Sequence, residues 1–347
     1  MHVGVKRMKH SASCSKNNRR RIAILFAAGI LLFFSAVAAG ILLGSTHISF
    51  SDIIHAVTNG AVGTGERIFL YVRLPRTLGC LLVGAALSVS GALIQNVLAN
   101  KLASPSIIGV NSGAGLAVTV CAALGIYGGW PLSLSAFFGA LLAVLLIGIG
   151  ARKWGASRGT VILLGVAMNS FLNAFSDTII TFHPNIGIMS NDFKIGDFSS
   201  VTYQKLIPAG IIITAAFILL LTLSNELEVL TLGEENARGL GLNTKTMRIW
   251  FLVLAALLAG CAVSLAGLLS FVGLLIPHAV RRLGATRARH LLLLCALYGA
   301  GFVTICETVA RTAFSPYEIP VGIIMAFLGA PFFVLILIKS KGGRMFD

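Results

Sequence analysis

Charged residues are scarce in this chain of 347 residues. They make up 11% of it, whereas a soluble domain carries roughly 25%, which excludes water as the main solvent. Acidic residues are the scarcer sign, with 12 Asp and Glu against 27 Lys and Arg. Hydrophobic residues supply 56%, in runs that recur from Ile22 to Ile338 and that suit a bilayer core taking roughly 20 residues per helix. The composition predicts an all-α integral membrane protein.

Several functional motifs are also missing. The chain has no G-x-x-x-x-G-K-[ST] loop, so it does not hydrolyse nucleotide itself, and energy must come from a gradient or a partner. It has no H-E-x-x-H, G-x-S-x-G or paired Cys/His spacing, so we expect no catalytic residue, metal site or bound cofactor. An intramembrane enzyme would have to use groups such as Asp177 or His278. The six cysteines form no C-x-x-C pair and are expected to be small buried fillers.

Charges, prolines and polar clusters divide the chain into about ten candidate spans in one bundle. They cover 22–44, 74–98, 107–126, 131–150, 159–182, 205–223, 248–265, 267–284, 291–310 and 321–339. We expect a basic tail at 1–21, a membrane domain at 22–340 and a second tail at 341–347. The first span is too long for an ordinary signal sequence, so we expect it to be retained. Small residues such as Gly84, Ser88, Gly91, Gly109 and Gly113 predict close helix packing.

The basic residues predict the orientation. With the amino terminus inside, the inner segments hold 21 Lys and Arg and the outer segments 6. Positively charged loops stay on the cytoplasmic side, so both termini are predicted in the cytoplasm of an inner-membrane protein. The basic residues behind the net charge of +15 cluster between the hydrophobic spans and do not form a stripe interleaved with exposed aromatics, so nucleic acid is not an expected partner.

Three arginines run against this bias on the outer side. Arg73 and Arg76 lie at the start of the second span and Arg311 at the outer end of the ninth. One interpretation is that they snorkel to lipid phosphates. The other is an arginine-lined outer face that receives carboxylates from a soluble partner.

The inner loop at 224–247 is unusually acidic for its side of the membrane. Within it, the stretch 230–241 predicts a short helix, because Glu234 and Glu235 suit a positive helix start and Gly239 or Gly241 allows a left-handed exit. The helix is either a solvated surface element or one that a motor protein grips.

Two acidic residues, Asp177 and Glu307, fall near the outer ends of spans. Ionisable groups within spans are costly and suggest function, and a proton-coupled carrier would need such groups near mid-membrane. Glu307 lies four residues before Arg311, the spacing of a helical ion pair, so we favour a structural role for it. An ion-coupled secondary transporter remains the alternative function.

Uncharged polar residues indicate a possible translocation path. They are Gln95, Asn96, Asn111, Ser112, Met168, Asn169, Asn173 and Ser176, where Met168 joins the set by its place beside Asn169. The irregular stretch from Asn100 to Pro105 separates the first two from the rest, and irregular backbone at membrane depth requires cover from protein or a water-filled cavity. Hydrogen bonding between helices explains any one of these residues equally well.

Five separated motifs, in one order, carry a family resemblance. They are Arg-Leu-Pro-Arg at 73–76 with Val83 to Ala92, Leu-Ala-Ser-Pro at 102–105 with Gly109 and Gly113, Gly233 to Gly241 ending in Ala-Arg-Gly-Leu-Gly, Phe271 to His278 with Arg281, and Ala310-Arg311 with 319–323 and 329–332. The chain resembles the permeases of the iron-siderophore, haem and vitamin B12 ABC importers from about Arg73 to Leu337.

The resemblance implies a fold and a set of partners. It implies the type II ABC importer permease fold, with a second permease copy that is identical or a paralogue, an extracellular or periplasmic substrate-binding protein, and two ATPase subunits that use ATP and Mg²⁺. Such a permease works by alternating access. An iron siderophore is the expected cargo, with haem or cobalamin as alternatives.

The resemblance also assigns roles to residues. The outer arginines Arg73, Arg76 and Arg311 would meet carboxylates of the binding protein. The inner helix would enter a cleft on the ATPase through Gly233, Glu234, Glu235, Ala237, Arg238, Gly239, Leu240 and Gly241. The fifth predicted span, at 159–182, would line the path.

Overall fold

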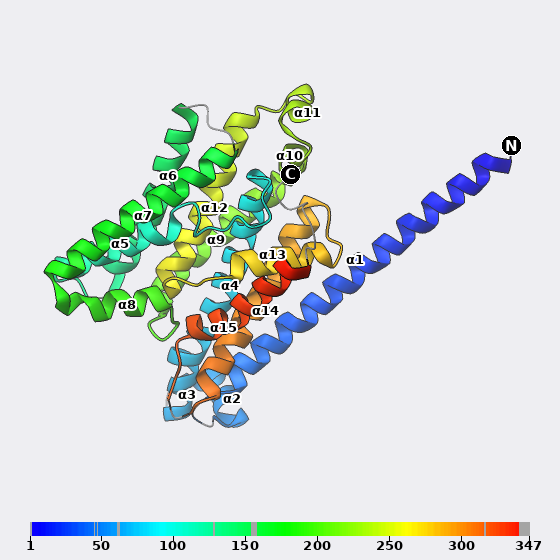
Figure 1. Cartoon of the computed structure of the whole chain (residues 1–347). Coiled ribbons are helices and arrows are strands. Elements are labelled where there is room, and N and C mark those ends of the chain that lie inside the picture. The colour runs from blue at the N-terminus through cyan, green and yellow to red at the C-terminus, as the bar shows by residue number, and fades with distance from the viewer. Residues whose placement is uncertain are drawn as a thin grey trace.

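The structure, a computed structural model, describes residues 2–44, 46, 48–60, 63–127, 129–153, 158–315 and 317–339. Every regular element within these ranges is helical, as the composition predicts. Each of the ten predicted spans overlaps one of the main helices (Figure 1): α1 (His2–Leu42), α4 (Leu74–Val97), α5 (Val110–Ala123), α6 (Gly129–Lys153), α7 (Arg158–Phe182), α9 (Tyr203–Thr222), α12 (Thr244–Ala266), α13 (Val272–Arg282), α14 (Ala288–Thr312) and α15 (Val321–Lys339).

Seven of these elements are long and apolar enough to cross a membrane, namely α1 over Arg19–Leu42, α4 with the turns before it, α6, α7, α9, α12 and α14. Two of the others are shorter, because α5 has 14 residues and α13 has 11, whereas α15 has 19 residues and is apolar from Val321 to Ile338. Backbone in the left-handed region precedes both α5 and α13: Gly109 has φ +85° and Phe271 has φ +67°. The predicted spans 107–126 and 267–284 are therefore each part helix and part irregular chain.

Seven further short helices connect the spans. They are α2 (Phe50–Asn59), α3 (Thr64–Ile68), the π turn η1 (Phe69–Arg73), the 3₁₀ turn η2 (Pro184–Ile186), α8 (Gly187–Ile195), α10 (Ser224–Thr231) and α11 (Glu234–Gly239). The sequence predicts α11 alone among them. α3, η1 and α4 follow one another without a break, as a single helical run from Thr64 to Val97.

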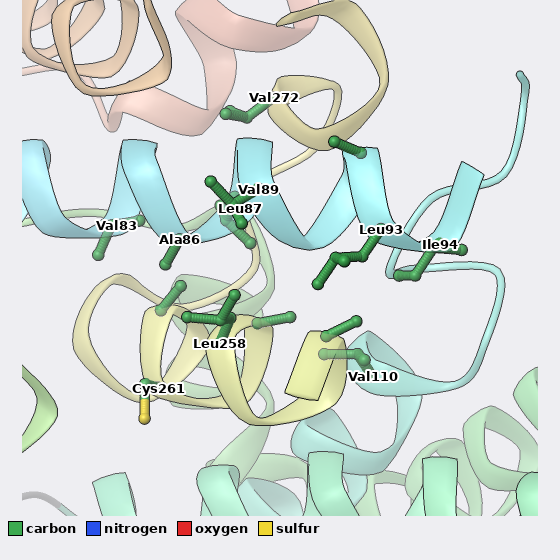
Figure 2. Packing of buried hydrophobic residues seen from close by; sticks show 14 of the residues in the cluster. Val83, Ala86, Leu87, Val89, Leu93, Ile94, Val110, Leu258, Cys261 and Val272 are labelled. Carbon is green, nitrogen blue, oxygen red and sulfur yellow. The ribbon is translucent and has the colours of Figure 1, made fainter. Parts of the chain in front are cut away.

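α4 is the central element of the bundle. α12, α13 and α14 pack directly against it. Figure 2 shows Val83, Ala86 and Leu93 of α4 facing Leu258 of α12, with Val110 of α5 nearby. The most apolar stretch of this run is 78% buried within the chain, against 17% for α7. α4 is thus a core helix, and α7 leaves most of its surface for lipid or a second protein.

Close backbone contacts confirm the prediction from small residues. A Cβ added at Gly84 of α4 would lie 2.8 Å from the carbonyl carbon of Gly299 in α14. One added at Gly91 would collide with the carbonyl oxygen of Gly273 in α13. Only glycine lets these helices approach so closely, since dispersion contacts must hold a bundle together where lipid is as apolar as the side chains.

The structure describes the amino-terminal end of the chain from His2 onward but not the residues after Lys339. α1 continues to His2, so the predicted boundary between a basic tail and the first span at 21/22 is not an element boundary, and the helix projects away from the bundle (Figure 1). The predicted tail at 341–347 lies outside the described residues. Cys80, Cys261, Cys295 and Cys306 are buried free thiols, as expected for fillers, whereas Cys121 is a free thiol that is only partly buried.

Candidate functional site

The carboxyl-terminal end of α1 is held by two buried arginines. Arg73 donates from Nη1 to the carbonyl oxygens of Ile41 (3.0 Å) and Leu42 (3.1 Å), and from Nη2 to that of Thr46. Arg311 donates from Nη2 to those of Gly40 (2.8 Å) and Leu43 (3.0 Å). The last carbonyls of a helix lack partners within it and carry a partial negative charge. The two guanidiniums therefore cap α1 and fasten it to the ends of α4 and α14.

Arg76 joins four segments of the chain through one guanidinium. Its Nε lies 2.5 Å from Glu307 Oε1 in α14, and its Nη1 donates to Glu318 Oε2 at 2.8 Å. Its Nη2 lies 3.7 Å from Asp197 Oδ1. Asp197 follows α8 and Glu318 precedes α15, so the ion cluster ties both connecting segments to α4 and α14. We call Arg76, Asp197, Glu307 and Glu318 the outer ion cluster, after the side of the membrane that the charge bias predicts for it.

Burial changes the interpretation of the three predicted docking arginines. Arg73, Arg76 and Arg311 are 2%, 5% and 3% exposed, and each donates to carbonyl or carboxylate groups of this chain, although Nε and Nη1 of Arg311 have no hydrogen-bond partner among the described residues. Neither snorkelling to lipid nor an open arginine surface describes them. The side chains of Asp197 and Glu318 are 31% and 38% exposed, so the rim of the outer ion cluster presents carboxylates.

The two acidic residues within spans have different surroundings. Glu307 is 1% exposed, between Arg76 and Arg311, whose Nη2 lies 3.8 Å from Glu307 Oε2. The predicted pair at i, i+4 is therefore present, and Arg76 supplies the shorter contact. Asp177 is exposed and lies 3.7 Å from Lys194 Nζ of α8. Neither carboxylate is free at mid-membrane.

At the other end of the bundle, the segment predicted as an acidic loop forms two short helices, α10 and α11. α11 begins with Glu234 and Glu235 in its first turn and is followed by Gly241 at φ +83°, as predicted. Ala237 is fully buried, whereas Leu232 and Leu240 beside the helix are 55% and 65% exposed. Glu235, Arg238, Gly239 and Gly241 are also exposed, and Gly233 is partly exposed. α11 therefore offers one open face that bears charges and two leucines.

Glu234 is the charged centre of this end. Its Oε1 accepts from Arg238 Nη2 at 2.5 Å, and its Oε2 accepts from Arg248 Nη2 of α12 at 3.3 Å. Partial burial raises the pKa of the Glu234 carboxyl, and the Arg248 and Arg238 guanidiniums outweigh this, so the pKa lies below its ordinary value. Glu234 is therefore held ionised toward α12 and is not an unpaired surface charge.

Two of the predicted path residues bind the half-buried guanidinium of Arg281. Gln95 accepts from Arg281 Nη1 and donates from Nε2 to the Gly273 carbonyl oxygen at 3.2 Å. Asn96 Oδ1 accepts from Arg281 Nη2 at 2.8 Å. These bonds fasten the carboxyl-terminal end of α4 to α13. The side chains belong to a contact between helices, which is the alternative left open by the sequence.

The remaining path residues gather around α5 and α7. Ser112 donates to Asn169 Oδ1 at 2.5 Å, and Asn169 donates to the carbonyl oxygen of Ser106 at 2.8 Å. Asn111 donates to Ser106 Oγ at 3.0 Å. These bonds cover part of the irregular chain before α5.

Farther along α7, Ser176 lies 2.9 Å from Thr119 Oγ1, which fixes α7 to α5. Met168 is half-buried against the core, and Asn173 alone of the eight predicted path residues is exposed.

α12 connects the two ends of the bundle. Arg248 lies near its start, and its last carbonyl, at Ala266, accepts from the backbone N–H of Asp197 at 2.9 Å. The 18 residues between Arg248 and Ala266 span about 27 Å of helix. In the middle, the Ala255 carbonyl oxygen accepts from Ser90 Oγ of α4 at 2.7 Å. α12 thus extends from Arg248, which contacts Glu234, to Ala266, which is bonded to Asp197 of the outer ion cluster.

Sequence reasoning missed the partners of the predicted residues. Asp197, Glu318 and Arg248 lie in connecting segments or at a helix start and belong to none of the five motifs. Charge balance was the available signal for the acidic partners. Buried arginines on the predicted outer side need acidic residues nearby, and the segments on that side hold few from which to choose. Thr119 and Ser190, whose hydroxyls lie 3.2 Å apart, carry no signal because such residues are common within spans.

Comparison with known proteins agrees with this architecture. The FecCD transport family matches residues 29–339. The ABC transporter permease YvrB of Bacillus subtilis is 36% identical over 95% of this chain and 97% of its own length. The vitamin B12 import system permease BtuC of Pectobacterium atrosepticum is 36% identical over 80% of this chain and 84% of its own. A solved metal-chelate type ABC transporter in an inward-facing conformation has a TM-score of 0.79 at 29% identity, over 91% of this chain and 99% of that one. The chain belongs to the FecCD transport family.

Proposed function

We propose that this member of the FecCD transport family is the permease subunit of an ATP-driven importer that moves a chelated metal across the cytoplasmic membrane. Three facts support the proposal: the family match, the relatives named as ABC permeases, and a solved neighbour described as a metal-chelate type transporter. Both termini lie in the cytoplasm, as the 21 to 6 charge bias predicts.

The observation that carries the proposal is α11. It is a short helix between two spanning helices, with one buried residue, Ala237, and two exposed leucines, Leu232 and Leu240, at its flanks. A helix of this kind fits a cleft on a soluble ATPase, which supplies the energy source that this chain lacks. Each of two permease copies would receive one ATPase subunit, with ATP and Mg²⁺ bound there.

We assign the outer face to a substrate-binding protein. Arg73, Arg76 and Arg311 serve this role by holding α1 and the segments around Asp197 and Glu318 in a fixed arrangement. Replacing both Arg73 and Arg76 by Glu should abolish docking, because the like charges would repel Glu307 and release both segments. Unchanged affinity for the binding protein in a pull-down, with the variant inserted normally, would remove this assignment.

The path is assigned to the open face of α7, which bears Asn173 and is bordered by the half-buried Met168, facing a second permease copy that is identical or a paralogue. α7 suits this place because, apart from α1, it is the least buried of the candidate membrane-spanning helices. Alternating access follows if ATP binding moves α11 and tilts the helices around the path.

The cargo is a metal enclosed in an organic chelator. Ferric siderophores and cobalamin are the first ligands to test, and haem follows.

The test is reconstitution. The chain is placed in proteoliposomes with the ATPase and the binding protein of its importer, and uptake of labelled cobalamin and of ferric siderophore is measured with ATP. Uptake should require ATP and disappear when the Lys of the ATPase phosphate loop is changed to Ala. Uptake by the chain alone on an ion gradient would establish the ion-coupled carrier instead. The structure gives that alternative little support, since Glu307 is paired with arginines and Asp177 with Lys194.

A further inference from the structure

α11 is joined to α12 by two polar side-chain contacts in the described chain. Glu234 of α11 accepts from Arg248 of α12 at 3.3 Å, across 14 residues of sequence. Arg238 Nε lies 3.5 Å from Thr244 Oγ1, at the outer limit of a hydrogen bond. The first contact is thus the principal polar link between the helix that faces the proposed ATPase and the spanning helix behind it.

The two ion pairs of Glu234 differ in their surroundings. Its pair with Arg238 lies within α11, and both side chains are more than one third exposed. Solvent screens such a pair, and it cannot transmit movement to another helix. The side chain of Arg248 is only 13% exposed, so it lies in a less screened environment where a charge pair is stronger. Arg248 Nε is moreover buried without a hydrogen-bond partner among the described residues, which makes its contact with Glu234 harder to replace.

α12 is placed to carry a displacement through the membrane. It packs against α4 and α6 along its length, and its far end binds the backbone N–H of Asp197. The backbone N–H of Leu268, just beyond α12, donates to the Phe193 carbonyl oxygen of α8 at 3.0 Å. α12 contains no proline, the commonest cause of a sharp kink, so a helix bonded at both ends in this way should move as one body more readily than it bends.

We propose that the ion pair between Glu234 and Arg248 is the strut through which movement of α11 reaches α12, and that Arg248 is a positioning residue for coupling. α11 and α12 then move together when the ATPase subunits close, and α12 carries the displacement to the segment at Asp197. This proposal rests on the proposed function, because it assumes that an ATPase grips α11.

The test exchanges the two charges. Four variants are reconstituted with the ATPase and binding protein: Glu234→Arg, Arg248→Glu, the double exchange, and Glu234→Arg combined with Arg289→Glu. Arg289 is exposed at the start of α14, so the last variant matches the charge of the double exchange without restoring the pair. The measured quantity is ATP hydrolysed per cargo molecule imported.

Each single variant should raise this ratio by about tenfold, the size expected for a coupled pair of contacting residues. The double exchange should return it to within about threefold of the unmodified chain, while the variant with Arg289→Glu should stay defective. Copurification of the ATPase with each variant separates a coupling defect from failed assembly. Equal defects in the double exchange and the Arg289 variant, with assembly intact, would overturn the strut.

A second measurement follows the movement itself. Cysteines at Asn236 of α11 and Trp250 of α12, both exposed, receive spin labels in a background whose other cysteines are replaced. The distance between them should stay constant between nucleotide-free and ATP-bound states, and should change in Arg248→Glu. A distance that changes equally in both chains would overturn the proposal. If the unmodified chain imports nothing with its ATPase, the proposed function fails instead, so the two failures are distinguishable.

Discussion

The buried carboxylate Glu307 gives the sharpest test of the outer ion cluster. Glu307→Gln preserves the volume of the side chain and removes its charge. Arg76 and Arg311 would then be two guanidiniums, 5% and 3% exposed, without their common counterion. Breaking a buried pair by removing one partner costs about 3–5 kcal/mol. Because Arg76 keeps Glu318 and Asp197, we expect the lower end, about 3 kcal/mol.

A matched control comes from the same guanidinium. Glu318→Gln removes a carboxylate that is also paired with Arg76 but is 38% exposed, so solvent screening should limit its cost to about 1 kcal/mol or less. Reversible unfolding of the purified chain in mixed detergent micelles, followed by circular dichroism, gives both values. The expected ratio of the two losses is about three.

The outcome also decides between two functions for Glu307. If it serves structure, the Gln variant loses stability and loses transport only to the extent that it misfolds. If it carried a proton through the membrane, the Gln variant would be as stable as the unmodified chain and would lose transport completely. That second result would refute the structural role of Glu307 and the ion cluster built on it.

Three further predictions concern other parts of the chain. Arg311→Gln should expose carbonyls at the end of α1 and cost about 1.5–3 kcal/mol, with faster amide hydrogen exchange confined to residues 39–46; slower or unchanged exchange there would contradict the capping role. Gly91→Leu should prevent α4 from reaching α13, because a Cβ at this position meets the backbone of Gly273, and the yield of folded protein should fall far below that of Leu93→Ile in the same helix. Because its arginine partners lower the pKa of Glu234 from an ordinary value near 4.5, the link from α11 to α12 is fully present above that value and is lost as the pH falls through the lowered pKa; the protection factors of the α11 amides, which are their exchange rates corrected for the intrinsic pH dependence of exchange, should therefore be constant from pH 7 to about pH 5 and fall once the pH drops below about 4.5.

Much of the fold follows from the sequence because the bilayer imposes it. An apolar run of sufficient length has to become a helix, since backbone groups in lipid must bond within their own segment. The breaks before α5 and α13 are harder to predict, because there the chain leaves helical geometry inside the protein. Gly109 and Gly267 are positions where left-handed backbone is easy, but Phe271 takes it without such a signal.

The candidate site is only partly predictable. α11 carries its own local signals, acids at its start and glycine after its end, and these predict it residue by residue. The outer arginines stand out in the sequence as exceptions to the charge bias, yet their burial depends on acids far away in sequence, since Arg76 and Glu318 are separated by 242 residues. A count of Lys and Arg treats all six basic residues on the predicted outer side as loop residues. Three of them, Arg73, Arg76 and Arg311, are instead buried inside the protein.

The π turn over Phe69–Arg73 controls the angular position of the chain before it. A π turn holds one residue more than an α turn, so α3 is rotated by about 100° about the helix axis relative to an uninterrupted α-helix. Deletion of a single residue in this turn would restore ordinary helical geometry and leave α4 in its place. It would also swing Thr64–Ile68 to another side of the outer rim. Gain or loss of one residue in this turn would thus rotate α3 and change which of its residues the outer surface presents. The packed part of the same helical run would stay unchanged.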